Sequence, residues 1–189
     1  MKQIERSDQK GRADIVFAVA KWFEREQKVP KIPIVLHDRA VAIDRNVGSI
    51  FGMCVHDSCP ICPETDLHVH ISLLSGFEFF EGSDRGLTRS RINEEDWNGI
   101  CEMDLTRTCL EEFFHFWQNI SYGDSYVSNV MHTATTKEEY HNNEIEIEAK
   151  SFAYAESERF LDAAYPVKED RDFFRDVLFQ IRKLERPTK

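Results

Sequence analysis

The chain has 189 residues, 41% of them hydrophobic, which is enough to bury one sizeable core, so we expect a single domain over residues 1–189. Its 34 acidic residues exceed its 24 basic ones, and the net charge of −10 repels a phosphate backbone or an anionic membrane. The charged N-terminal residues lack the apolar stretch of a secretory signal. We therefore expect a cytoplasmic protein that binds neither nucleic acid nor membrane; its oligomeric state is not indicated.

The first part of the chain predicts a helix followed by short strands. Apolar residues recur at helical spacing over residues 13–27, and Pro30 and Pro33 end this pattern. The next segments are short, rich in β-branched residues and separated by turn signals, which is typical of an antiparallel meander. These segments are residues 32–37, 40–43, 49–56 and 67–74.

The second half predicts helices at about residues 103–121, 137–164 and 168–184. Helix, strands and then helices is the order of an α+β fold, with the helices on one side of a small, mostly antiparallel sheet. No repeat, low-complexity run or linker indicates a domain boundary.

The segment TCLEEFFHFWQ, residues 108–118, carries the first candidate site. On a helix, Glu111 and His115 lie one turn apart on one face, and Glu112 lies beside them at an offset suited to contacting a metal-bound water. The alternative is an ordinary amphipathic helix in which His115 is a core or rim histidine. Its buried face would then consist of Leu110, Phe113, Phe114 and Trp117.

A later acid-rich segment, EIEIEAKSFAYA, offers a partner for this helix. Glu146, Ala149 and Ala153 share one helical face, so small side chains would let another helix approach closely while a carboxylate points inward.

Together, the Glu-Glu-x-x-His motif, the preceding strands and the acid-rich segment resemble the zincin-like metallopeptidases of the gluzincin type, particularly the ImmA/IrrE-like peptidases. The resemblance covers roughly residues 13–165. It implies a metal-dependent peptidase with a peptide or protein substrate, in which Glu112 is the general base. The metal ligands that it implies are His115 and Glu146, with Glu148 as the competing choice, and Glu111 in the position of the first ligand.

Two residues depart from the family pattern. Glu111 stands where the family has its first ligand histidine, and Lys150 stands where the second motif has Asp or Asn. One imidazole and two carboxylates form a harder ligand set, which suits iron or manganese as well as zinc. The added negative charge would make the ion a poorer Lewis acid, so we expect reduced or absent peptidase activity.

A second cluster, CVHDSCPICPETDLHVH, predicts a structural zinc site. If the two flanking strands form a hairpin with their polar faces matched, Cys54 lies near His70 and His56 near His68. A Cys-x-x-Cys loop with one cysteine and one histidine from the strands gives a tetrahedral, thiolate-rich shell. The predicted ligands are Cys54, Cys59, Cys62 and His70, with His68 or His56 as alternatives to His70.

Other interpretations of the cysteines stay open. Two of the clustered thiols could form a disulfide, or all three could be unrelated and free, while a redox role is disfavoured because no helix begins at Cys59. Cys101 and Cys109 are expected to be small buried residues.

Two further functions compete with the peptidase. A catalytically inactive zincin-like protein could serve as a binding or interaction module held together by the zinc site. A di-iron carboxylate protein is suggested by a second Glu-x-x-His, Glu138 to His141, but such bundles need four long helices, and the first half of this chain predicts strands.

Overall fold

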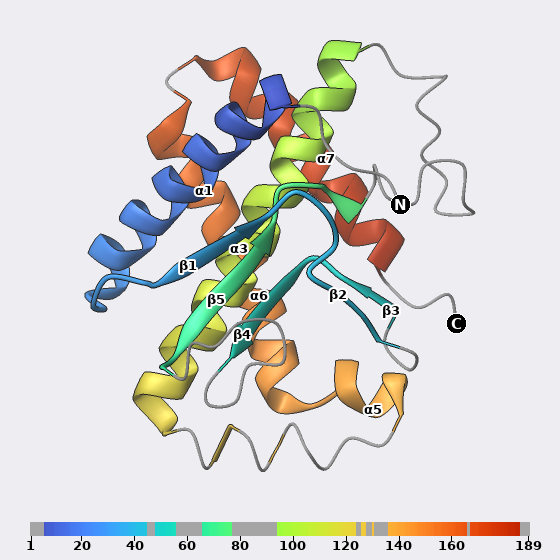
Figure 1. The fold of residues 1–189 in the computed structure, drawn as a ribbon. Helices are drawn as coiled ribbons and strands as arrows, with labels where there is room; N and C mark the ends of the chain where they lie inside the picture. The colour runs from blue at the N-terminus through green and yellow to red at the C-terminus, as the bar shows by residue number, and fades with distance from the viewer. Residues whose placement is uncertain are drawn as a thin grey trace.

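The fold is α+β and mostly helical, with a small mixed sheet (Figure 1). The computed structural model describes residues 6–44, 48–55, 66–76, 94–123, 126–127, 130, 136–165 and 167–185. Its helices are α1 (Arg6–Gln27), α3 (Glu94–Tyr122), α5 (Lys137–His141), α6 (Glu144–Ala164) and α7 (Lys168–Glu185). Its strands are β1 (Ile34–His37), β2 (Ala42–Asp44), β3 (Gly48–Ile50), β4 (Gly52–Val55) and β5 (His68–Ser72).

The main sheet has the strand order β1-β5-β4, so β5 is central. β1 pairs with β5 in parallel, Ile34 opposite Val69, while β4 pairs with β5 antiparallel, Gly52 opposite Ile71. β2 and β3 form a separate antiparallel pair. The prediction of antiparallel neighbours is thus confirmed for β2 with β3 and for β4 with β5, but it is wrong for β1, which pairs in parallel with β5. Turn signals mark where the chain reverses. They do not predict that β1 pairs with β5, which follows it in the sequence only after β2, β3 and β4.

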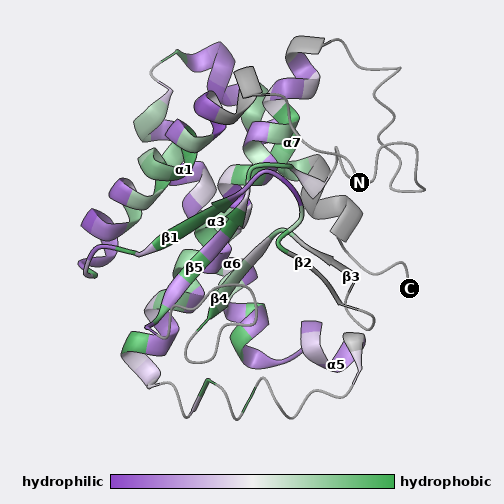
Figure 2. Ribbon diagram, viewed as in Figure 1, coloured by the Kyte–Doolittle hydropathy of each residue, from purple (hydrophilic) through white to green (hydrophobic). Residues whose placement is uncertain are grey.

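The principal core lies between the sheet and the helices α1, α3 and α6. Val69 and Ile71 of β5 are fully buried, and their neighbours include Phe23 of α1 and Phe113 of α3, whose rings meet edge to face at 5.9 Å. Figure 1 shows α3 and α6 passing behind the sheet, and Figure 2 shows hydrophobic and hydrophilic bands alternating along the helices. Such alternation is expected of helices that bury one face.

A second apolar cluster explains why α3 begins earlier than the sequence predicts. Trp97 and Met103, both 2% exposed, pack with Phe174 and Leu178 of α7. This contact between distant segments extends α3 to residue 94, although the local pattern over residues 94–102 is mostly polar.

The predicted helix over residues 137–164 is interrupted. Thr136 forms a capping box with Glu139 at the start of α5, and Asn143 caps α6 by accepting a hydrogen bond from the backbone N–H of Glu146. Asparagine favours such caps over helix interiors because its side chain competes for backbone groups. The break places Glu146 in the first turn of α6.

Within the described residues, no helix is both long enough and apolar enough to cross a membrane.

Candidate metal centre

Three side chains from α3 and α6 converge at the interface between these helices. Glu111 and His115 project from α3 and Glu146 from α6, and one potential ligand atom from each lies within 4.8 Å of the other two. The Nε2 atom of His115 is 3.3 Å from Oε1 of Glu146. His115 is 8% exposed and Glu146 is 3% exposed, so the group is almost enclosed.

Small residues allow this close approach. Ala149 and Ala153 of α6 are fully buried on the face that carries Glu146, as the sequence predicts. Glu148, the alternative ligand, is exposed, and its carboxylate accepts hydrogen bonds from Gln118 and Tyr122. The geometry therefore brings Glu146, and not Glu148, to His115.

Gln118 orients the imidazole of His115. The Nδ1–H group of His115 donates to Oε1 of Gln118 at 2.8 Å, and Nε2 of Gln118 donates to the backbone carbonyl of Ile145 at 3.2 Å. Gln118 is fully buried, so these bonds fix its position. The arrangement leaves Nε2 of His115 facing the two carboxylates, and a partner on the other ring nitrogen is what orients a histidine ligand.

Two cations flank the carboxylates. Nη1 of Arg107 is 2.6 Å from Oε2 of Glu111, and Nζ of Lys150 is 3.2 Å from Oε2 of Glu146. Burial raises the pKa of Glu111, although Arg107 opposes this effect. Each of the two carboxylates is thus paired with a cation of the chain itself.

The ionisation of His115 and Glu146 is mutually coupled. Burial disfavours the charged imidazole, but the hydrogen bond to Glu146 and the surrounding carboxylates outweigh it and raise the pKa of His115 to about 9. Burial also opposes ionisation of Glu146, yet His115 and Lys150 lower its pKa to about 2. The hydrogen bond between His115 and Glu146 thus favours the charged form of both groups.

Glu112 lies against strand β4, next to the group. Its carboxylate accepts a hydrogen bond from the backbone N–H of Cys54, and burial raises its pKa to about 8, with His115 opposing and Glu111 adding to the rise. A Cβ atom on Gly52 would overlap the side chain of Glu112, so only glycine leaves room for this carboxyl group. A carboxyl group with this pKa can take up and release a proton near neutral pH.

Tyr140 is a site residue to which the sequence assigns no role. Its hydroxyl donates to Glu146, and burial and the nearby carboxylates raise its pKa. Arg107 and Gln118 are likewise missed by the sequence. The useful signal was present for Arg107, because a basic residue four positions before Glu111 shares its helical face.

The donor set fits a divalent cation. One imidazole nitrogen and two carboxylate oxygens from facing helices are suitable ligands for zinc, iron or manganese. Arg107 and Lys150 compete with such an ion for the carboxylates, and His115 must lose its proton before it can bind.

The predicted pairing of Cys54 with His70 is wrong by one residue. Cys54 lies opposite Val69, while Met53 lies opposite His70. Opposed residues share a face, so Cys54 points toward α3, where its sulfur accepts a hydrogen bond from Nδ2 of Asn119 at 3.9 Å. The register of β4 differs from the predicted one because Gly52 and Cys54 are small enough to pack beneath α3. His56, Cys59 and Cys62 lie outside the described residues.

His68 and His70 join a third histidine on the other face of the sheet. Nε2 of His37 is 2.8 Å from Nδ1 of His70, and Nε2 of His70 is 3.0 Å from Nε2 of His68. His70 turns one ring nitrogen to each neighbour, so the three rings form a chain and do not converge on one point. Burial, followed by His37 and His68, lowers the pKa of His70 to about 4.

The second Glu-x-x-His does not assemble a site among the described residues. Glu138 is exposed, and Nδ1 of His141 is 3.0 Å from Nζ of Lys150. The sheet also distinguishes this fold from an all-helical di-iron bundle.

Comparisons of the chain with protein-family models, curated proteins and solved structures find no match.

Proposed function

We propose that this chain is a zincin-like, metal-dependent peptide hydrolase. Glu111, His115 and Glu146 would hold zinc, iron or manganese, and Glu112 would act as general base. The observation that carries the proposal is the convergence of the three potential ligand atoms within 4.8 Å. The buried carboxyl group of Glu112 adjoins them, as its electrostatic interaction with His115 indicates.

The residues around the group have complementary roles in this proposal. A bound cation would lower the pKa of a coordinated water and polarise the peptide carbonyl. Glu112 accepts the proton of the attacking water and returns it to the leaving amine. Gln118 holds the imidazole in the tautomer that presents Nε2. The hydroxyl of Tyr140, directed at Glu146, positions that carboxylate.

A second candidate is a catalytically inactive binding protein with the same scaffold. It is favoured by the two ion pairs, Arg107 with Glu111 and Lys150 with Glu146, which already neutralise the carboxylates. In that case the charged group stabilises the α3–α6 interface and binds no metal.

Metal content and peptide cleavage, measured on the same samples, separate these candidates. Metal-stripped protein is loaded with zinc, manganese or ferrous iron and incubated with a peptide library that is analysed by mass spectrometry. We expect Glu112→Gln to keep the metal and to lose cleavage by about 100-fold or more. His115→Ala should lose both, whereas Glu158→Gln, an exposed change on α6, should match the wild type.

The inactive candidate predicts a different set of results. The wild type would bind no metal at this group, and no peptide would be cleaved. Glu111→His is then informative, because a gain of cleavage would identify a peptidase scaffold that has lost one ligand.

We keep the structural zinc as a separate proposal, with Cys59, Cys62 and one of His70, His68 and His56 as ligands. Because Cys54 points toward α3, this proposal no longer includes it, and the fourth ligand would have to be another residue. The metal stoichiometry should therefore be repeated with Cys59→Ser, which removes only this second equivalent.

A further inference from the structure

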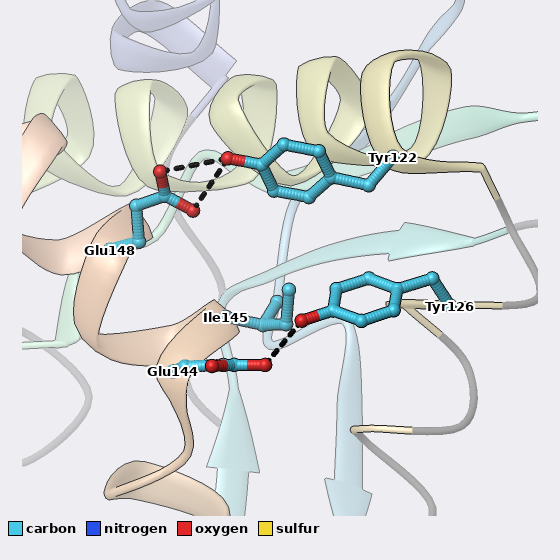
Figure 3. A pocket seen from close by; sticks show the side chains of 5 residues that line it. All are labelled: Tyr122, Tyr126, Glu144, Ile145 and Glu148. Atoms are coloured by element: carbon cyan, nitrogen blue, oxygen red, sulfur yellow. Dashed lines mark hydrogen bonds between the residues drawn. The ribbon is translucent and has the colours of Figure 1, made fainter.

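A cavity of about 550 Å³ opens where the end of α3 faces the first turns of α6. Its lining consists of Tyr122, Tyr126, Glu144, Ile145 and Glu148 (Figure 3). A cavity of this size can hold one large side chain of a bound peptide.

The lining combines two aromatic rings with two carboxylates. Tyr122 donates its hydroxyl to Glu148, at 2.9 and 3.1 Å from the two oxygens, and Tyr126 donates to Glu144. Figure 3 shows the two Tyr–Glu pairs side by side, with Ile145 between them. The hydroxyls hold both carboxylates in place, and each carboxylate retains lone pairs for a further donor.

The two rings keep much of their surface uncovered. Tyr122 is 41% exposed and Tyr126 is 46% exposed, although the hydroxyl of each is already bonded. They contact each other edge to face, with centroids 6.0 Å apart. A cation beside such rings gains from their quadrupoles as well as from the carboxylates.

The cavity is joined to the metal group through Gln118. Nε2 of Gln118 donates to Glu148 in the cavity wall at 3.0 Å, while its Oε1 accepts from His115. Ile145, another wall residue, immediately precedes Glu146. The cavity and the proposed metal group therefore meet at Gln118 and at the first turn of α6.

We propose that this cavity binds the positively charged side chain of an arginine or lysine in a peptide substrate. The role of this peptide as a substrate rests on the proposed peptide hydrolysis. The carboxylates accept charge-assisted hydrogen bonds from the guanidinium or ammonium group, and the tyrosine rings flank it. None of the described residues that line the cavity is basic. Acidic side chains are rejected by Glu144 and Glu148, and neutral ones leave the carboxylates without a cation.

Binding can be measured without hydrolysis by comparing two blocked tripeptides, acetyl-Gly-Arg-Gly-amide and its citrulline analogue. Citrulline has nearly the shape of arginine but no charge. The titrations use metal-free Glu112→Gln protein and follow amide chemical shifts by NMR and Trp117 fluorescence. Trp117 contacts the ring of Tyr122 at 5.5 Å, so it reports on the cavity.

We expect the arginine peptide to bind about tenfold more tightly than the citrulline peptide. The ratio should fall to about one in Glu144→Gln/Glu148→Gln. Because Glu148 also contacts Gln118, Glu144→Gln alone serves as a milder variant and should lower the ratio by about threefold. Glu158→Gln, on the same helix but away from the cavity, should leave the ratio unchanged.

Equal binding of both peptides, or an unchanged ratio in the double variant, would overturn this assignment. The outcome is independent of catalysis because the protein is metal-free and lacks Glu112. A preserved arginine preference in a wild type that binds no metal and cleaves nothing would instead reject the hydrolase and keep the cavity as a cation-binding site.

Discussion

The imidazole of His115 and the carboxylate of Glu146 face each other across the interface of α3 and α6, with Nε2 3.3 Å from Oε1. Without a metal they form an ion pair, because the pKa of His115 is raised to about 9 and that of Glu146 is lowered to about 2. A metal at this position must replace the proton of His115. The balance between the protonated site and the metal-bound site therefore depends on pH.

Metal affinity should therefore rise with pH. Below a pH of about 9, each bound ion displaces one proton from His115, and the affinity should increase about tenfold per pH unit, then level off above it. Calorimetric titration in two buffers of different ionisation enthalpy measures both the affinity and the protons released. An affinity that does not change with pH would show that metal binding displaces no proton from His115.

The metal-free protein should show the opposite trend in stability. A raised pKa of His115 stabilises the fold fully below the unfolded value of about 6.5, and this contribution is lost as the pH rises through about 9. Urea unfolding of wild type and His115→Gln across this range tests the point. The variant should have the flatter profile.

Lys150→Asn should strengthen metal binding. The ammonium group, 3.2 Å from Oε2 of Glu146, competes with a cation for that carboxylate, and its removal should lower the dissociation constant by about tenfold. The same titration on Lys168→Gln, which removes an exposed charge on α7, controls for net charge. Equal effects of the two changes on the dissociation constant would show that Lys150 acts only through the net charge of the protein.

Gly52→Ala should separate catalysis from metal binding. The new Cβ would overlap Glu112 and lie 2.8 Å from its Oε1, so the carboxyl group must move away from the N–H of Cys54. We expect cleavage to fall by about tenfold or more while the metal content stays unchanged. Gly11→Ala, with nothing within 4 Å, should instead stabilise α1 by about 0.5–1 kcal/mol and leave cleavage intact.

Much of the site follows from helical spacing alone. The separation of Glu111 and His115 by one turn predicts their common face, and the small residues Ala149 and Ala153 predict the close helix that supplies the acid. Glu146 is favoured over Glu148 because it shares the helical face of Ala149 and Ala153. The cap at Asn143, which the continuous polar pattern over residues 137–164 does not predict, places Glu146 in the first turn of α6.

The sheet was less accessible to sequence reasoning. Val69 and Ile71 of β5 enter the core, as the alternation of apolar and polar residues in this strand predicts. The parallel pairing of β5 with β1 is not predicted, because it joins segments that are far apart in the sequence. In β4, Cys54 lies on the face toward α3 and Met53 on the opposite face, because the space beneath α3 and Glu112 admits only the small Gly52 and Cys54.

The histidine chain on the sheet should make the fold sensitive to mild acid. The pKa of His70 is lowered to about 4, so between about pH 6.5 and 4 the unfolded chain takes up a proton that the folded chain does not. Stability should fall over this range by roughly 1–3 kcal/mol more in wild type than in His70→Gln. Urea unfolding at several pH values measures the difference, and parallel profiles would contradict it.

The most direct test of the metal centre is an anomalous difference map from crystals grown at a pH of about 8 with zinc or manganese. We expect a peak between Nε2 of His115 and the carboxylates of Glu111 and Glu146, at roughly 2.0–2.2 Å from the coordinating atoms. A map without density there, in which Lys150 and Arg107 still pair with the two carboxylates, would contradict it.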